Sequence, residues 1–179
     1  AIPDHLIRTK LNPPRASEKL IRRQHLIARL SEGSSRQVTV FSASAGYGKS
    51  TLALQWLSGN AVPFAWLSLD EHDNRLEQFL NYLTAALRTV YPQLGQETEG
   101  MLRQPKLPKP EYLADSLLRD IQESPERGFL VLDDYHSIRN IEIHSIMRRL
   151  IQQQSANLHL VLLSRVDPPL SLAKLRGRG

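Results

Sequence analysis

The chain of 179 residues contains no cysteine, which excludes disulfide bonds and thiolate zinc sites. It also lacks any apolar run near the roughly 18 residues of a membrane span, and its first 30 residues lack the apolar core of a secretory signal. Aromatic residues are few, at 6%, and no basic stripe is interleaved with them. These absences, with the length, predict a cytoplasmic globular protein of one domain that has no membrane partner.

The net charge of +5 is concentrated at the two ends of the chain. Residues 1–37 hold 8 basic and 3 acidic side chains, residues 165–179 hold 4 and 1, and the middle holds 11 and 14. A basic balance can indicate nucleic-acid binding, but a phosphate site also accounts for positive charge, and we favour the second reading. The chain begins without methionine and ends on a basic segment, so we expect it to be a fragment of a longer protein.

Strands and helices are predicted to alternate along most of the chain. Short apolar or β-branched runs indicate strands at 37–43, 62–70, 128–134 and 158–164. Helical spacing of apolar residues indicates helices at 18–30, 50–57, 76–90, 111–123 and 142–154. The segment 92–110 holds four prolines and is expected to be a loop. This order predicts an α/β fold with a parallel sheet covered by helices on both faces.

The stretch "SASAGYGKST", residues 42–51, resembles the phosphate loop G-x-x-x-x-G-K-[ST], with Ala43 in place of the first glycine. A loop from a strand into a helix directs backbone N–H groups and the helix N-terminus toward phosphate. Lys49 would reach the β- and γ-phosphates, and the Ser50 hydroxyl would bind Mg²⁺. The candidate nucleotide-binding residues of this stretch are Ala45, Gly46, Tyr47, Gly48, Lys49, Ser50 and Thr51.

The stretch "FLVLDD", residues 129–134, is an apolar strand that ends in two carboxylates. In a parallel sheet these acids lie at the carboxyl edge, beside the phosphate loop. Asp133 would hold Mg²⁺ through a water, and Asp134 would orient or deprotonate the water that attacks ATP. Arg165 follows the next strand and would contact the γ-phosphate; a solvated terminal arginine is equally consistent with its spacing.

Other polar and aromatic residues are expected to have structural roles. For the acids after the second strand a solvated turn is favoured over a place in the site. The six histidines form no ligand cluster, and the two near the "LDD" stretch are expected to make structural hydrogen bonds. Both tryptophans are expected in the core. These residues are Asp70, Glu71, Asp73, His136, His144, Trp56 and Trp66.

Several segments together resemble the ATPase module of the large ATP-dependent LuxR-type transcriptional regulators. This is the MalT-like group within the signal-transduction (STAND) class of P-loop ATPases. The resemblance covers nearly all of the chain and rests on "TKLNPP", "IRRQHLIARL", "SAGYGKSTLALQW", "AWLSLDEHDN", "FLNYLTAAL", "LVLDDYHSIRN" and "LHLVLLSRVDPPLSLAKLRGRG". In that family alanine is common at the first P-loop position, so Ala43 is a family trait. Ser44, where proline is usual, and Ser50-Thr51, where two threonines are frequent, depart from its pattern.

The resemblance implies more than the residues show by themselves. It implies an ASCE-type P-loop core over residues 36–179, truncated before a last strand that would lie beside the P-loop strand. It implies that residues 1–35 contribute to the adenine site, with Ile21, Arg22 and Arg23 near the base. It also implies that Arg165 occupies the place of the γ-phosphate sensor.

The resemblance further implies a nucleotide switch. Proteins of this family are inactive with ADP and self-associate with ATP and inducer, and they hydrolyse ATP weakly. Their winged-helix, sensor and DNA-binding domains are absent from this chain, so DNA contact would need a C-terminal domain that is missing here. Two rivals remain: a P-loop kinase or other phosphotransferase, with Arg103, Lys106 and Lys109 on a mobile lid, and a module that holds ADP without turnover.

Overall fold

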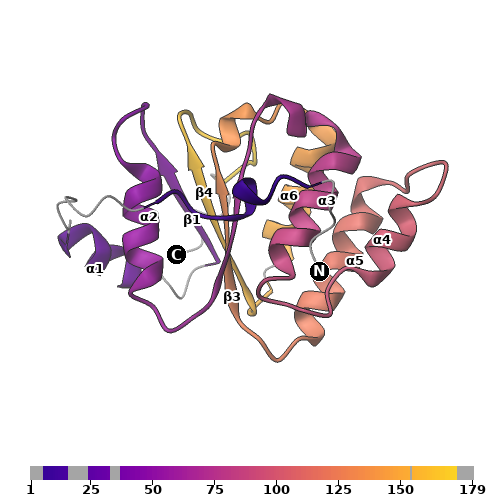
Figure 1. Cartoon of the computed structure of the whole chain (residues 1–179), viewed down its shortest axis with the longest axis horizontal. Helices are drawn as coiled ribbons and strands as arrows, with labels where there is room; N and C mark the ends of the chain where they lie inside the picture. The colour runs from indigo at the N-terminus through magenta and orange to yellow at the C-terminus, as the bar shows by residue number, and fades with distance from the viewer. Residues whose placement is uncertain (1–5, 16–23, 33–36, 154, 173–179) are drawn as a thin grey trace.

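A computed structural model describes residues 6–15, 24–32, 37–153 and 155–172 of the chain. Its centre is a sheet of four strands, β1 (Val38–Ser42), β2 (Phe64–Ser68), β3 (Gly128–Asp133) and β4 (Leu158–Ser164), in the order β1-β4-β3-β2 (Figure 1). All three strand pairs are parallel, which confirms the predicted sheet. Within the described residues β1 pairs with β4 alone, so its other side is an edge of the sheet.

Helices cover both faces of the sheet, as the alternating pattern predicts (Figure 1). Helices α1 (Gln24–Glu32) and α2 (Lys49–Ser58) lie on one face. On the other face lie α3 (Leu76–Leu87), α4 (Gln96–Leu102), α5 (Pro110–Glu123) and α6 (Ile141–Gln152). No helix among the described residues is long and apolar enough to span a membrane.

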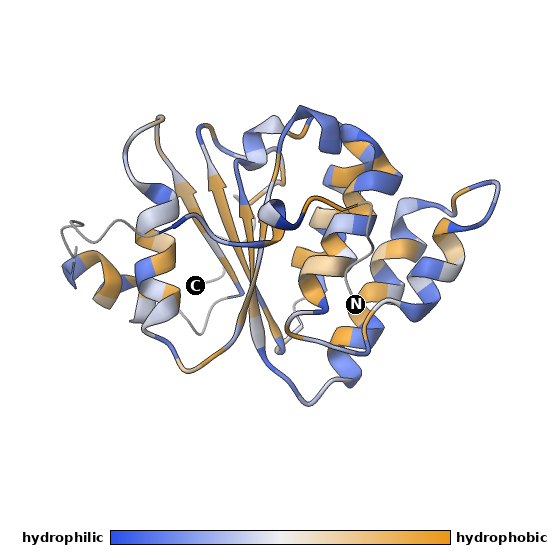
Figure 2. Cartoon of the chain, in the orientation of Figure 1, coloured by the Kyte–Doolittle hydropathy of each residue, from blue (hydrophilic) through white to orange (hydrophobic). Residues whose placement is uncertain are grey.

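Two apolar layers hold the helices to the sheet, because alternate residues of each buried strand face opposite sides. Figure 2 shows the strands as the most hydrophobic part of the fold. On the α2 face Trp56 packs edge-on against Phe129, with ring centroids 5.3 Å apart, and Trp66 joins the same cluster. Both tryptophans are buried, which confirms their predicted place in the core. Leu130, Leu132 and the apolar faces of α3, α5 and α6 form the second layer.

The segment 92–110 is not simply a loop, because it contains α4. Gly95, at φ 87°, precedes the helix, and Thr98 and Leu102 are buried against the rest of the fold. The Thr98 hydroxyl donates a hydrogen bond of 3.2 Å to Ser116 Oγ of α5. The prolines were misleading because they flank the helix instead of interrupting it.

The predicted helices agree with the structure to within three residues at each described end. Helix α3 ends at Leu87 instead of residue 90, and residues 88–90 continue as a turn. The described part of the first helix runs to Glu32, two residues beyond its predicted end. The predicted start of that helix lies outside the described residues.

The leader, residues 6–12, lies against β2 and α3 and contains a short 3₁₀ helix, η1 (Arg8–Leu11). Lys10 Nζ is 2.6 Å from Asp73 Oδ2 and 2.8 Å from Asp70 Oδ2. These acids belong to the turn that includes η3 (Glu71–Asn74), and the side chain of Asp73 is fully buried. The expectation of a solvated turn is therefore wrong for Asp73, because the leader covers it.

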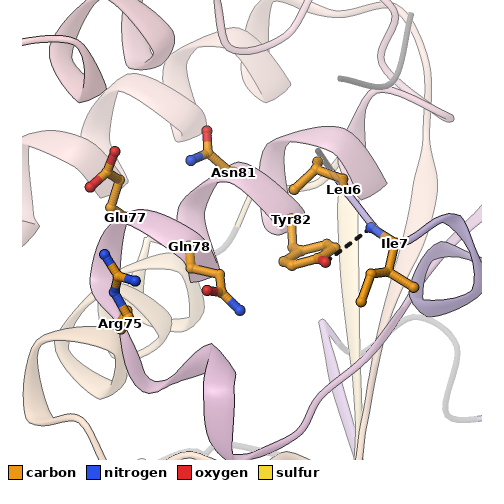
Figure 3. A pocket seen from close by; sticks show the side chains of 7 residues that line it. All are labelled: Leu6, Ile7, Arg75, Glu77, Gln78, Asn81 and Tyr82. Atoms are coloured by element: carbon orange, nitrogen blue, oxygen red, sulfur yellow. Dashed lines mark hydrogen bonds between the residues drawn. The ribbon is translucent and has the colours of Figure 1, made fainter. Parts of the chain in front are cut away.

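An open cavity of about 390 Å³ lies between the leader and α3 (Figure 3). The Tyr82 hydroxyl at its side accepts a hydrogen bond of 3.0 Å from the Ile7 N–H. Its lining residues are Leu6, Ile7, Arg75, Glu77, Gln78, Asn81 and Tyr82. None of them belongs to the loop between β1 and α2 or to the carboxylates that end β3, so this cavity is separate from the candidate phosphate site.

Candidate phosphate-binding site

The loop from β1 to α2 has the backbone that a phosphate cradle requires. Gly46 and Gly48 adopt φ angles of 83° and 74°, in the left-handed region that favours glycine. A Cβ atom on either glycine would meet no atom within 4 Å, so the backbone angle, and not lack of space, calls for glycine. Gly48 is the N-cap of α2 and has no side chain to cap it. The first N–H groups of this helix are thus available to an anion.

Lys49 lies folded over this loop. Its ammonium donates hydrogen bonds to the carbonyl oxygens of Ala43, at 2.6 Å, and Ser44, at 3.1 Å. An ammonium group is a strong donor with no acceptor capacity, and phosphate oxygens are stronger acceptors for it than carbonyls. The side chain is therefore placed to exchange these two carbonyls for a phosphate bound in the loop.

Ser50 joins the phosphate loop to the carboxylates at the end of β3. Its hydroxyl donates a hydrogen bond of 3.0 Å to Asp133 Oδ1, and the Asp134 N–H donates one of the same length to that oxygen. Burial raises the pKa of the Asp133 carboxyl, and the neighbouring Asp134 charge adds to the rise, although the Ser50 hydrogen bond opposes it. A cation beside Asp133 would favour its charged form.

These two oxygens fit a magnesium ion. Mg²⁺ prefers hard oxygen ligands and usually keeps several of its waters. A Ser50 oxygen bound to the ion would keep its hydrogen bond of 3.0 Å to Asp133, and the Asp133 carboxylate would then hold a water of the ion. The described residues gather no group of three His, Cys, Asp or Glu side chains for a metal, so phosphate and water would supply the other ligands.

Asp134 leaves the strand with its backbone in the left-handed region, at φ 57° and ψ 39°, and its side chain is half exposed. His136 Nδ1 lies 3.8 Å from Asp134 Oδ1, beyond hydrogen-bonding distance. This buried nitrogen has no hydrogen-bond partner among the described residues, so Nδ1 does not make the structural hydrogen bond predicted for His136. The same prediction is confirmed for His144, whose Nδ1 is 2.8 Å from the Tyr135 hydroxyl.

The imidazole of His136 is surrounded by the charges of the candidate site. Burial lowers its pKa, and the positive charges of Arg165 and Lys49 lower it further, while Asp134 opposes the change. The lowered pKa favours the neutral form of the ring. Its place could not be read from the sequence, where a lone histidine two residues after the acids carries no distinctive signal.

Arg165 is exposed and follows the last residue of β4 directly. In the β1–β4 register Ser42 pairs with Ser164, and the Ala43 N–H donates to the Ser164 carbonyl at 3.2 Å. Arg165 therefore leaves the sheet at the same level as the phosphate loop. This arrangement brings five residues to the carboxyl ends of the strands: Lys49, Ser50, Asp133, Asp134 and Arg165.

The other predicted site residues fall into two sets. One set lies in the exposed loop and the first turn of α2, and Tyr47 is 64% exposed there. This set is Ala45, Gly46, Tyr47, Gly48 and Thr51. The predicted adenine contacts, Ile21, Arg22 and Arg23, lie outside the described residues.

A parallel sheet, a glycine loop that enters a helix and two acids after a buried strand define an α/β P-loop NTPase fold. Cdc6p from Pyrobaculum aerophilum shares it with a TM-score of 0.57 and 17% identity, over 92% of this chain and 46% of that one. The Drosophila ORC bound to AT-rich DNA and Cdc6 shares it with a TM-score of 0.52 and 11% identity, over 84% of this chain and 47% of the other. At such identities the likeness shows the fold alone.

Sequence comparison identifies the group within this fold. The HTH-type transcriptional regulators MalT of Serratia proteamaculans and Cronobacter sakazakii are 37% and 38% identical to the chain over 173 residues. The match covers 97% of the chain and 19% of each regulator. The chain is a MalT-like NTPase module and spans about a fifth of the length of these curated relatives. No family model matches it.

Proposed function

We propose that the chain binds ATP and ADP with Mg²⁺ and works as a nucleotide switch for the assembly of a transcriptional activator. The observation that carries this proposal is the hydrogen bond of 3.0 Å between Ser50 and Asp133, which lie 83 residues apart in the sequence. It joins the phosphate loop to the carboxylate strand, next to Lys49. The phosphate cradle comes from one of these segments and the carboxylates from the other.

In this proposal the loop residues 45–51 surround the phosphates through backbone N–H groups. Lys49 leaves the carbonyls of Ala43 and Ser44 and binds the β- and γ-phosphates. Ser50 and Asp133 hold Mg²⁺, Asp133 through a water, and the ion would neutralise phosphate charge. Asp134 orients or deprotonates the attacking water, and Arg165 contacts the γ-phosphate. Contact of Ile21, Arg22 and Arg23 with adenine is part of the same proposal.

The regulatory part of the proposal extends from the relatives. They are named HTH-type transcriptional regulators, and a switch in such a protein needs slow hydrolysis, so that the ATP state persists long enough to act. ATP would favour self-association and ADP the inactive form. DNA contact would belong to another domain of the full-length protein, which would act in the cytoplasm.

The position of α4 favours a switch over a phosphotransferase. A kinase reading needs a mobile lid over the phosphates, and the segment 92–110 was the candidate for it. This segment contains α4, which packs on α5 on the face of the sheet opposite α2 (Figure 1). Its basic residues are therefore remote from the phosphate loop.

Calorimetric titration with ATP and with ADP, in the presence of Mg²⁺, tests the proposed site. Lys49→Ala removes a charged hydrogen bond to phosphate, worth about 1.5 to 3 kcal/mol, so affinity should fall by roughly 10- to 150-fold. Lys106→Ala removes an exposed lysine of the segment 92–110 and should leave affinity unchanged. Equal affinities in wild type and Lys49→Ala would disprove the site.

A further inference from the structure

The side chain of Asn74 joins two loops that are remote in the sequence. Its Nδ2 donates to the carbonyl oxygens of Glu71, at 2.9 Å, and Ser137, at 2.8 Å. Its Oδ1 accepts from the N–H groups of Arg139, at 2.6 Å, and Asn140, at 3.0 Å. Two donated and two accepted bonds use the full capacity of a side-chain amide. Asn74 therefore bridges the turn after β2 to the turn after β3.

Asn140 returns the contact and extends it into α6. Its Nδ2 donates to the carbonyl oxygen of Asn74 at 2.9 Å, while its Oδ1 accepts from the Glu142 N–H at 2.8 Å and caps α6. The turn at residues 134–140, the start of α6 and η3 thus form one hydrogen-bonded unit.

The bridged turn begins at Asp134, the candidate hydrolytic carboxylate. Its left-handed backbone, at φ 57°, is uncommon for a residue other than glycine and persists where the surroundings hold it. The Asp134 carbonyl accepts from the Ser137 N–H at 2.9 Å, and Ser137 in turn is held by Asn74 through its own carbonyl. Asn74 is therefore connected to the backbone of Asp134 through a single residue, Ser137.

The other end of the bridge is anchored as well. Asp70 and Asp73 close a reciprocal capping box around η3, the element that carries Asn74. The buried Asp73 also accepts from Lys10 at 2.6 Å and from Gln78 at 3.3 Å. Hydrogen bonds thus hold η3 in place, and Asn74 bonds the turn after β3 from a fixed position.

We propose that Asn74 is a positioning residue for ATP hydrolysis, which acts on Asp134 through the turn at residues 134–140. The four hydrogen bonds of its side chain go to residues 71, 137, 139 and 140 and none to the phosphate loop, so it contributes to the rate of hydrolysis and not to nucleotide affinity. The inference rests on the proposed function, in which Asp134 activates the attacking water.

The test compares Asn74→Ala with Asn157→Ala. Asn157 is a matched control because its Nδ2 also joins segments remote in the sequence, with bonds at the end of α5 of 3.2 Å to the Ile121 carbonyl and 2.9 Å to the Ser124 carbonyl. It precedes β4 and lies at the amino end of the sheet, away from the carboxylates. Both variants lose a bridging amide, so a purely structural role would affect them alike.

Two quantities are measured for each variant: the affinity for ATP and ADP by calorimetry, and the single-turnover rate of Mg·ATP hydrolysis with the chain in excess. Because small misplacements of a catalytic group cost up to about 100-fold in rate, Asn74→Ala should be at least roughly 10-fold slower, with affinity within about 2-fold of wild type. Asn157→Ala should keep both values. If Asn74→Ala does not fold by circular dichroism, Asn74→Asp replaces it, since its carboxylate keeps the acceptor for the Arg139 and Asn140 N–H groups and loses both donors.

The outcomes separate this inference from the proposed function. Equal rates in the Asn74 and Asn157 variants would overturn the inference, and so would a parallel loss of affinity and rate. A wild-type chain that binds ATP without turning it over would also overturn it, because no hydrolytic carboxylate would then be positioned. A wild-type chain that binds no nucleotide would disprove the proposed function itself.

Discussion

Replacement of Lys10 by methionine should lower the free energy of unfolding of the chain strongly. Methionine keeps much of the apolar stem and removes the charge. The side chains of Lys10 and Asp73 are 11% and 0% exposed, and their charged atoms lie 2.6 Å apart. The substitution therefore leaves a buried carboxylate without its cation.

The magnitude follows from the bonds that Asp73 would retain. Removal of one partner from a buried ion pair costs about 3 to 5 kcal/mol. Asp73 would keep the Asp70 N–H at 2.9 Å and the Gln78 amide at 3.3 Å, which favours the lower end of this range. A loss of about 3 kcal/mol corresponds to a fall in Tm of roughly 6 to 12 °C for a chain of this size.

Urea unfolding at neutral pH measures the loss, with Lys106→Met as the control for the same change at an exposed position. Asp73→Asn and the double variant complete a mutant cycle that isolates the pair. If Lys10→Met lies within about 1 kcal/mol of wild type, as is typical of exposed pairs, the reasoning about burial is wrong.

The pH dependence of stability should change in the same variant. Burial opposes the charged form of Lys10, but hydrogen bonds to Asp70 and Asp73 outweigh it and raise the Lys10 pKa. Burial likewise opposes the charged form of Asp70, but the Lys10 and His72 hydrogen bonds lower its pKa. The stability that Lys10 and Asp70 contribute together should thus be lost as pH falls through the lowered pKa of Asp70 and as pH rises through the raised pKa of Lys10. Lys10→Met should lack the change at high pH and show a smaller one at low pH, because the His72 hydrogen bond to Asp70 remains.

The remaining predictions concern the site and the basic ends. Asp134→Ala should retain ATP affinity and lose hydrolysis, and turnover that persists would mean that another residue activates the water. Burial raises the pKa of Asp133. As pH is lowered, Mg²⁺-dependent ATP affinity should therefore begin to fall at a higher pH than it would for a carboxyl with the ordinary pKa of 3.8. If ATP affinity depends on pH in the same way with and without Mg²⁺, this prediction is wrong. The chain should bind duplex DNA only weakly and with strong salt dependence, and a specific footprint would disprove that expectation.

Sequence patterns sufficed for the sheet and for much of the candidate site because both depend on local signals. The strands are short apolar or β-branched runs, and the glycines of the phosphate loop lie within a few residues of Lys49 and Ser50. Asp133 and Asp134 could be placed beside the loop because parallel strands end at one edge. The sequence did not predict α4, because the prolines on either side of it indicate a loop. This helix has only seven residues, and its stability comes from packing on α5.

What the sequence determined by itself was therefore the order of strands and helices and the chemistry available at the ends of strands. The tertiary structure alone decided which distant side chains meet there. Lys10 buries Asp73 across 63 residues, and Asn74 holds Arg139 and Asn140 across 65 and 66. Such contacts follow from how the leader and the turns pack over the sheet edge. Lysine, aspartate and asparagine are common surface residues, and their spacing in the sequence does not indicate the partners that they reach in space.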